Sequence, residues 1–254
     1  MLGSSPRKYP KSLSNLFGIF HAETHIIYIC ASKILARTCL ASITIYIFML
    51  LEIYYMSKQP KVEDMLREII DAGNRSRRYL GINDETLRLL SEVSDSVLTH
   101  KNEIVDGAMA SLLQEEACLS VAQRAGLSAE RARALFLYWL ELVFTGGYDE
   151  KHSLHITKIG LAHVKAGVPP IFMINQMGAF AREILRRCSC DPKHLEAVMQ
   201  ALFWNLAVMA RSYEMIRLMV FREATGISSE VYERLVHLYT KDAYSQLAKE
   251  LGVG

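Results

Sequence analysis

The sequence predicts an all-α protein, and two observations lead to this prediction. The 254-residue chain is rich in Leu, Ala, Glu and Arg, and it lacks the alternating Val, Ile and Thr runs that are typical of strands. Its apolar residues recur at intervals of three and four between Gly, Pro and Asn-Asp signals. With 51% hydrophobic and 22% charged residues, it has the composition of a globular chain. We therefore expect helices around a sizeable core.

The helix boundaries follow from these signals in chain order. A first helix is expected at 61–72, where Gly73-Asn74 predicts its end. A second helix begins after the capping residue Asn83 and reaches Leu98. Proline suits the first turn of a helix because no amide donor is needed there. The remaining helices are expected at 100–114, 128–145, 152–166, 170–188, 192–221 and 228–251.

Residues 1–55 differ in composition from the rest of the chain. The uncharged run TCLASITIYIFMLL, at 38–51, is shorter than the roughly 20 residues that a membrane-spanning helix needs. Three interpretations are open: Met56 is the natural start, residues 38–55 anchor the chain in a membrane, or this segment is an extra docked helix. We therefore divide the chain into an N-terminal extension (1–55), a central domain (56–226) and a C-terminal helix (227–254).

Charge and cysteine content exclude some classes of protein. A formal net charge of +2, evenly spread, is too small to predict a nucleic-acid surface. Five cysteines without a repeated CxxC pair fit a reducing, cytoplasmic compartment better than a disulfide framework.

His152 and His155 have a helical spacing that would hold a metal weakly, but no acid completes a zinc set on that turn. We expect both imidazoles to lie in solvent.

One histidine lies on an apolar helix face. Within HITKIGLAHVKAGVPP, at 155–170, the residues Ile156, Ile159, Gly160 and His163 share a face. A lone histidine in such a place is usually a neutral imidazole bonded to a backbone carbonyl. The alternative is a haem ligand, because iron accepts an imidazole nitrogen and a porphyrin needs an apolar slot between helices. Gly160 would then let a flat macrocycle approach the helix.

Residues 79–221 resemble the globin-coupled sensor and protoglobin family. The segments that carry the resemblance are YLGIND at 79–84, IGLAHVKAGVPP at 159–170 and MGAF at 177–180. The resemblance implies a globin fold with an extra helix before the A helix and no separate D helix. It also implies haem b held by His163 as the proximal metal ligand, and a sensor or carrier of O₂, CO or NO.

The resemblance has further implications for partners. Family members often form a homodimer through the last two globin helices, here 170–188 and 192–221, and often carry an output domain after the globin. The residues after Phe221 are too few for such a domain, so we expect a separate signalling partner. We expect no enzyme, because no distal His/Arg couple is visible. The alternative function is a haem-free globin-fold interaction module of a signalling complex.

The distal side departs from the family pattern. Many relatives place a tyrosine in the B helix, and the alignment of VDGAMASLL at 105–113 puts Met109 at its position. The thioether of Met109 is an alternative sixth ligand for the iron. A polar E-helix position falls on Leu135, with Tyr138 and Trp139 as neighbouring polar-tipped side chains. We expect an apolar cofactor pocket, lined by Met109, Ala132, Leu135, Phe136, Trp139, Phe172 and Met173.

Overall fold

Helices make up almost all of the described chain, which comprises residues 62–188 and 191–252 of a computed structural model. All of these residues belong to one unit, Pro60–Gly254. The expectations for residues 1–55, including a membrane anchor at 38–55 and a start at Met56, lie outside the described residues. Among the helices that the structure does describe, none is long and apolar enough to span a membrane.

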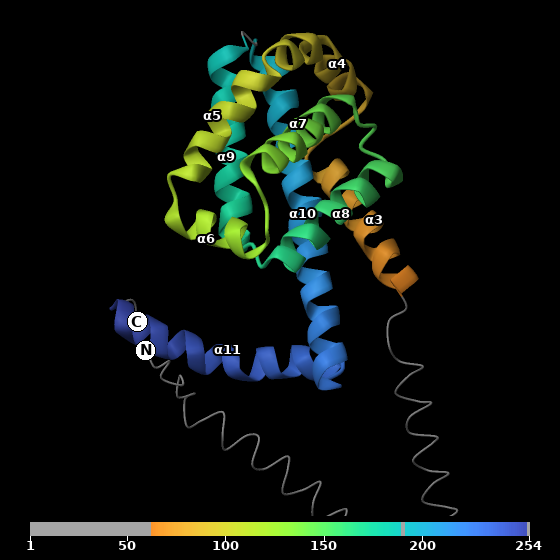
Figure 1. Cartoon of the computed structure of the whole chain (residues 1–254). Helices are drawn as coiled ribbons and strands as arrows, with labels where there is room; N and C mark the ends of the chain where they lie inside the picture. The colour runs from red at the N-terminus through yellow and green to blue at the C-terminus, as the bar shows by residue number, and fades with distance from the viewer. Residues whose placement is uncertain (1–61, 189–190, 253–254) are drawn as a thin grey trace, which may run out of the picture. The chain divides into compact units, whose positions relative to one another are not determined.

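The helix order confirms the predicted all-α class, and Figure 1 shows the arrangement. Helix α6 was not expected, because a nine-residue helix offers too few turns for a clear apolar period. The other helices begin and end within a few residues of the expected positions, with the exception of α3. The elements are α3 (Val62–Tyr79), α4 (Asp84–Thr99), α5 (Lys101–Leu113), α6 (Glu116–Arg124), α7 (Ala129–Thr145), α8 (Glu150–Ala166), α9 (Pro170–Arg187), α10 (Pro192–Thr225) and α11 (Ser229–Leu251).

Helix α3 continues past the Gly73-Asn74 pair that predicts its end. Gly73 is buried where α3 packs on α8 and α10. A Cβ atom at this position would lie 2.5 Å from the Oγ atom of Ser153. The carbonyl of Gly73 also accepts a hydrogen bond from the indole N–H of Trp204 at 2.9 Å. Gly73 therefore permits close helix packing, a role that its local sequence does not distinguish from a helix stop.

Local capping explains where several other helices begin. The side chains of Asn83, Ser128, Asp191 and Ser228 each accept a hydrogen bond from a backbone amide in the first turn of α4, α7, α10 and α11. Such caps satisfy amides that have no partner inside the helix. These starts are therefore properties of short sequence segments.

Helices α7 and α8 both contact α10, but their other neighbours differ: α4 and α5 for α7, α3 and α6 for α8. Helix α10 packs most extensively on α8 and α3 and also contacts α4, α9 and α7, while α5 packs on α9 and α7 (Figure 1). No extended contact joins α7 to α8 in the part of the chain that the structure describes. Helix α10 runs beyond the helices that pack on it and leads to α11, where the rings of Phe221 and Tyr232 lie 5.6 Å apart. The lack of an extended contact between α7 and α8 matters for the site.

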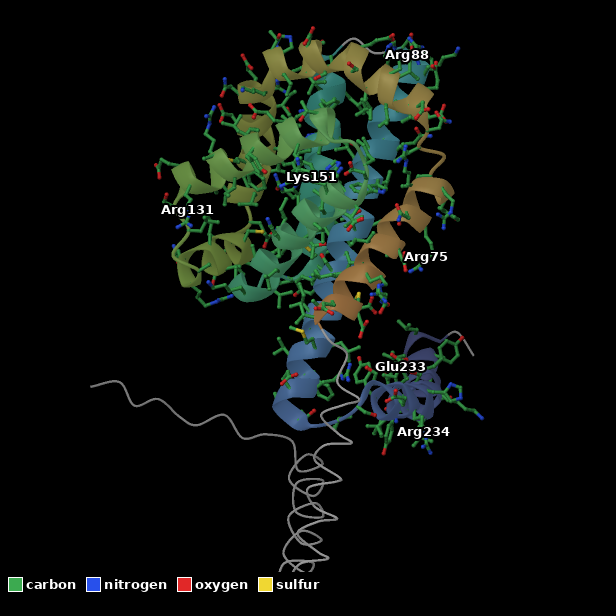
Figure 2. All side chains as sticks on the ribbon, turned by 90° about the vertical axis from the view of Figure 1, so that its right-hand side faces the viewer. Arg75, Arg88, Arg131, Lys151, Glu233 and Arg234 are labelled. Carbon is green, nitrogen blue, oxygen red and sulfur yellow. The ribbon has the colours of Figure 1, made fainter. Side chains whose placement is uncertain are left out.

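Charged side chains lie mainly on the outside of these helices, as Figure 2 shows for Arg75, Arg88 and Arg131. Glu183 on α9 is an exception, because its side chain is 4% exposed and packs against Gly107 of α5. Arginines on α9 form ion pairs with it, so the buried carboxylate is compensated.

Candidate functional site

His163 lies half-buried in the last turn of α8, with one ring nitrogen free. Its Nδ1 atom is 2.8 Å from the carbonyl oxygen of Ile159 one turn earlier. Because a carbonyl oxygen can only accept a hydrogen bond, Nδ1 carries the proton and donates this hydrogen bond. The Nε2 atom has no hydrogen-bond partner among the residues that the structure describes. Burial lowers the pKa of His163, and the hydrogen bond to Ile159 opposes this only in part. The neutral ring therefore offers an unprotonated Nε2 to a metal.

The turn after His163 holds the end of α8 in place. Gly167 adopts a left-handed conformation with φ of +68°, which glycine reaches without a steric penalty. The amide of Val168 then donates a hydrogen bond to the carbonyl of His163 at 2.9 Å. Pro170 begins α9 directly afterwards. The GVPP segment thus ties down the backbone that carries the candidate ligand.

Gly160 faces helix α10, not an open slot. Gly160 is buried against α10, where an added Cβ atom would overlap the Oγ atom of Ser212 and lie 3.1 Å from the carbonyl oxygen of Met209. The expectation that Gly160 admits a flat macrocycle is therefore wrong. Residues three apart in a helix differ by about 60° in direction, so Gly160 can contact α10 while His163 points elsewhere.

The expected E-helix residues form an apolar face on α7. Ala132 and Phe136 are partly buried against the core, whereas Leu135 is 54% exposed. The rings of Phe136 and Trp139 both meet Phe180 of α9 edge-on, with centroid distances of 5.4 and 4.8 Å. Sequence reasoning missed Phe180 as a wall residue, although it belongs to the MGAF segment. The one feature of the sequence that could have predicted this role is the position of Phe180 among the apolar residues of α9.

The indole N–H of Trp139 is a polar group on this apolar face. Trp139 is 6% exposed, and its Nε1 atom has no hydrogen-bond partner among the described residues. An unsatisfied buried donor costs about 1–3 kcal/mol. Such a group is a candidate donor to a water or to a ligand.

The charged residue on α7 that lies next to this face is directed toward α5. Arg133 forms an ion pair with Asp106 at 2.6 Å and donates a hydrogen bond to Asn102 at 2.9 Å. Its charge is thereby held on the side of α7 that packs on α5. The Ala132 and Phe136 face of α7 carries no charged side chain of its own.

The remaining expected pocket residues lie on α5 and at the start of α9. Met109 is buried within the core, and Phe172 is half-buried. Met173 is also buried, and it borders a hollow that α3, α10 and α11 line. Of the expected pocket residues, Phe136 and Trp139 are therefore brought together by their shared contact with Phe180. Met173 lies elsewhere, toward α3 and α10.

His152 is buried, so the expectation that it lies in solvent is wrong. It is 2% exposed, its Nδ1 atom accepts a hydrogen bond from the amide of Tyr148 at 3.2 Å, and its ring lies 4.8 Å from that of Trp204. Burial lowers the pKa of His152 to about 4. His155, one turn later, is half-buried. The structure shows no cluster of three or more metal-ligating residues within the described ranges.

Comparison with known proteins agrees with this architecture. Residues 74–213, more than half of the chain, match the family model described as Protoglobin. Among solved structures, the globin domain of the Geobacter sulfurreducens globin-coupled sensor is similar, with 24% sequence identity and a TM-score of 0.50. The match covers 55% of this chain and 96% of that one, and at this identity it shows the fold alone. No curated protein matches the chain. The chain has a globin fold and belongs to the protoglobin family.

Proposed function

We propose that this chain is a haem-binding globin that binds a diatomic gas, with the Nε2 atom of His163 as the proximal ligand. The observation that carries the proposal is that the Nδ1 atom of His163 is bonded to the carbonyl of Ile159 while its Nε2 atom, at the end of α8, has no hydrogen-bond partner among the described residues. The bound haem would supply the iron at which O₂, CO or NO coordinates. Sensing or transport, and not catalysis, is the role that we assign to the site.

The orientation of the His163 ring and the exposed apolar surface of α7 suit such a group. The hydrogen bond to Ile159 fixes the tautomer and orientation of the ring, as a backbone carbonyl often does for a ligating histidine. Helices α7 and α8 have no extended contact in the described part of the chain, and Leu135 on α7 is 54% exposed. Covering Leu135 with an apolar macrocycle would contribute about 1 kcal/mol. The same face would exclude water from the iron.

The ligand assignment is tested by haem retention. His163→Ala should purify without tight haem, whereas His237→Ala, at an exposed position on α11, should retain it. The measurement is the ultraviolet-visible spectrum of the ferric, ferrous and CO-bound proteins, with circular dichroism to show that each variant is folded. Stoichiometric haem and an unchanged ferrous spectrum in His163→Ala would contradict the assignment. A folded wild-type protein that shows no Soret band after haem addition would support the haem-free interaction module instead.

We also propose that the protein forms a homodimer through α9 and α10. Large apolar side chains on these two helices, Ile171, Ile174, Leu185 and Phe203, are 48–53% exposed. Helices α9 and α10 contact each other, so these side chains belong to neighbouring elements. We further propose that the protein is located in the reducing cytoplasm and that it signals through a separate partner protein.

A further inference from the structure

A hollow of about 850 Å³ lies where α10 leaves the other helices and leads to α11 (Figure 1). Residues 210–222 of α10 and the beginnings of α3, α9 and α11 line it, and we call it the α10 hollow. Sites for small molecules have volumes of roughly 300–1,000 Å³. Among the described residues, none of α7 or α8 lines the hollow, and Met173 is the residue that it shares with the expected haem pocket.

Tyr213 on α10 is a buried polar side chain that lines this hollow. It is 7% exposed, and its hydroxyl has no hydrogen-bond partner among the residues that the structure describes. The hydroxyl is not one of the unpaired atoms that are sealed within the core, so it opens into the hollow. Buried polar groups in proteins are nearly always paired with protein, water or ligand. The Tyr213 hydroxyl is therefore available to a bound molecule.

Arg217, one turn further along α10, adds a positive charge beside Tyr213. Its guanidinium carbon lies 5.7 Å from the centre of the Tyr213 ring, and the side chain has no ion-pair partner within the described part of the chain. The guanidinium group and the phenol both donate hydrogen bonds, and the two oxygens of a carboxylate accept from several donors. Together, Tyr213 and Arg217 offer a carboxylate one neutral and one charged donor.

The unpaired charges around the hollow favour an anion. Of the four carboxylates that line it, three pair with an arginine: Glu68 and Glu214 with Arg211, and Asp64 with Arg67. Two lining arginines, Arg217 and Arg222, have no ion pair to a described residue, whereas Glu233 is the one lining carboxylate in that position. A negatively charged head group would therefore balance the excess.

The other walls of the hollow are mainly apolar. Their large apolar side chains are Met65 on α3, Met173 on α9, and Leu218, Met219 and Phe221 on α10. Methionine side chains adapt to irregular shapes, and residues 210–222 of α10 span about 18 Å. We propose that the α10 hollow binds an amphipathic carboxylate, whose apolar chain lies along α10 and whose head group accepts hydrogen bonds from Tyr213 and Arg217.

Isothermal titration calorimetry of the full chain with decanoate, below its micelle-forming concentration, tests this proposal. Decanoate should bind with one-to-one stoichiometry. Decanol and decyltrimethylammonium, which have the same chain with a neutral and a cationic head group, should bind at least tenfold more weakly. Arg217→Gln should raise the Kd of decanoate roughly tenfold, and Tyr213→Phe should raise it about three- to tenfold, because each variant removes one donor.

Two variants on α11 serve as matched controls. Arg234→Gln and Tyr244→Phe make the same chemical changes at positions that do not line the hollow, and they should leave the Kd of decanoate unchanged (Figure 2). Circular dichroism shows whether each variant is folded, and if one of the two hollow variants is misfolded, the other decides.

Three results would overturn the proposal. Absence of saturable decanoate binding would remove the site altogether. Decanoate binding that neither Arg217→Gln nor Tyr213→Phe weakens would place the ligand elsewhere, and a change in the Soret band that persists in both variants would place it at the haem. Decanol or decyltrimethylammonium binding as tightly as decanoate would show that a carboxylate is not the group that the hollow recognises.

Discussion

Titration of His152 should make the stability of this globin fall in mildly acidic solution. The ring is buried between Tyr148 and Trp204, and it is held neutral because burial lowers its pKa from the ordinary 6.5 to about 4. The charge of Asp149 opposes this shift, and His155 adds to it. In the unfolded chain the same imidazole takes up a proton below about pH 6.5. The change His152→Asn removes the titrating ring and therefore isolates its contribution.

The sign and size of the effect follow from proton linkage. Between pH 6.5 and 4 the unfolded state binds a proton that the folded state does not, so the free energy of unfolding decreases as the pH falls. A pKa difference of about 2.5 units corresponds to about 3 kcal/mol in full. Between pH 7.5 and 4.5, His152 should account for a loss of about 2.5 kcal/mol.

The assay is urea unfolding followed by circular dichroism at a series of pH values. His152→Asn is expected to be less stable than wild type at pH 7.5, because packing is lost, although its amide oxygen can still accept the hydrogen bond from Tyr148. The difference between the two proteins should shrink by about 2.5 kcal/mol at pH 4.5. His237→Asn, at an exposed position, should follow the wild-type curve. A difference that is constant with pH would refute the argument from burial.

Three further predictions concern the site and its support. Met109→Tyr should slow O₂ dissociation about 10- to 150-fold, as a hydrogen bond to a charged group is worth roughly 1.5–3 kcal/mol, and should change CO dissociation much less. Stopped-flow release rates test this, and a wild-type O₂ complex that is already slow but becomes fast in Trp139→Phe would identify the indole as the donor. Leu135→Asp should weaken haem retention in a haem-transfer assay, whereas Ala134→Asp should not. Gly73→Ala should lower the free energy of unfolding by about 1–3 kcal/mol, measured in urea, because the added methyl group overpacks the contact between α3 and α8.

The arrangement around His163 could be predicted from the sequence because it depends only on residues that are close together in the chain. A period of 3.6 residues places His163 and Ile159 on one face, and a carbonyl one turn earlier is within reach of the Nδ1 atom of any such histidine. The Gly-Val-Pro-Pro turn that ends α8 is equally a property of adjacent residues. The assignment of His163 as the iron ligand stays a prediction, which the family match supports.

The sequence by itself determined the all-α class and most helix boundaries, because caps and turns such as those at Asn83 and Gly167 act over a few residues. Only the tertiary structure decided the roles of Gly73, Gly160 and His152. Each of these residues contacts α10, which is far away in the chain, and the periodicity of one helix does not reveal which neighbour covers which face. Whether a glycine ends a helix or admits a second one, and whether a histidine is solvated or buried, depends on that neighbour.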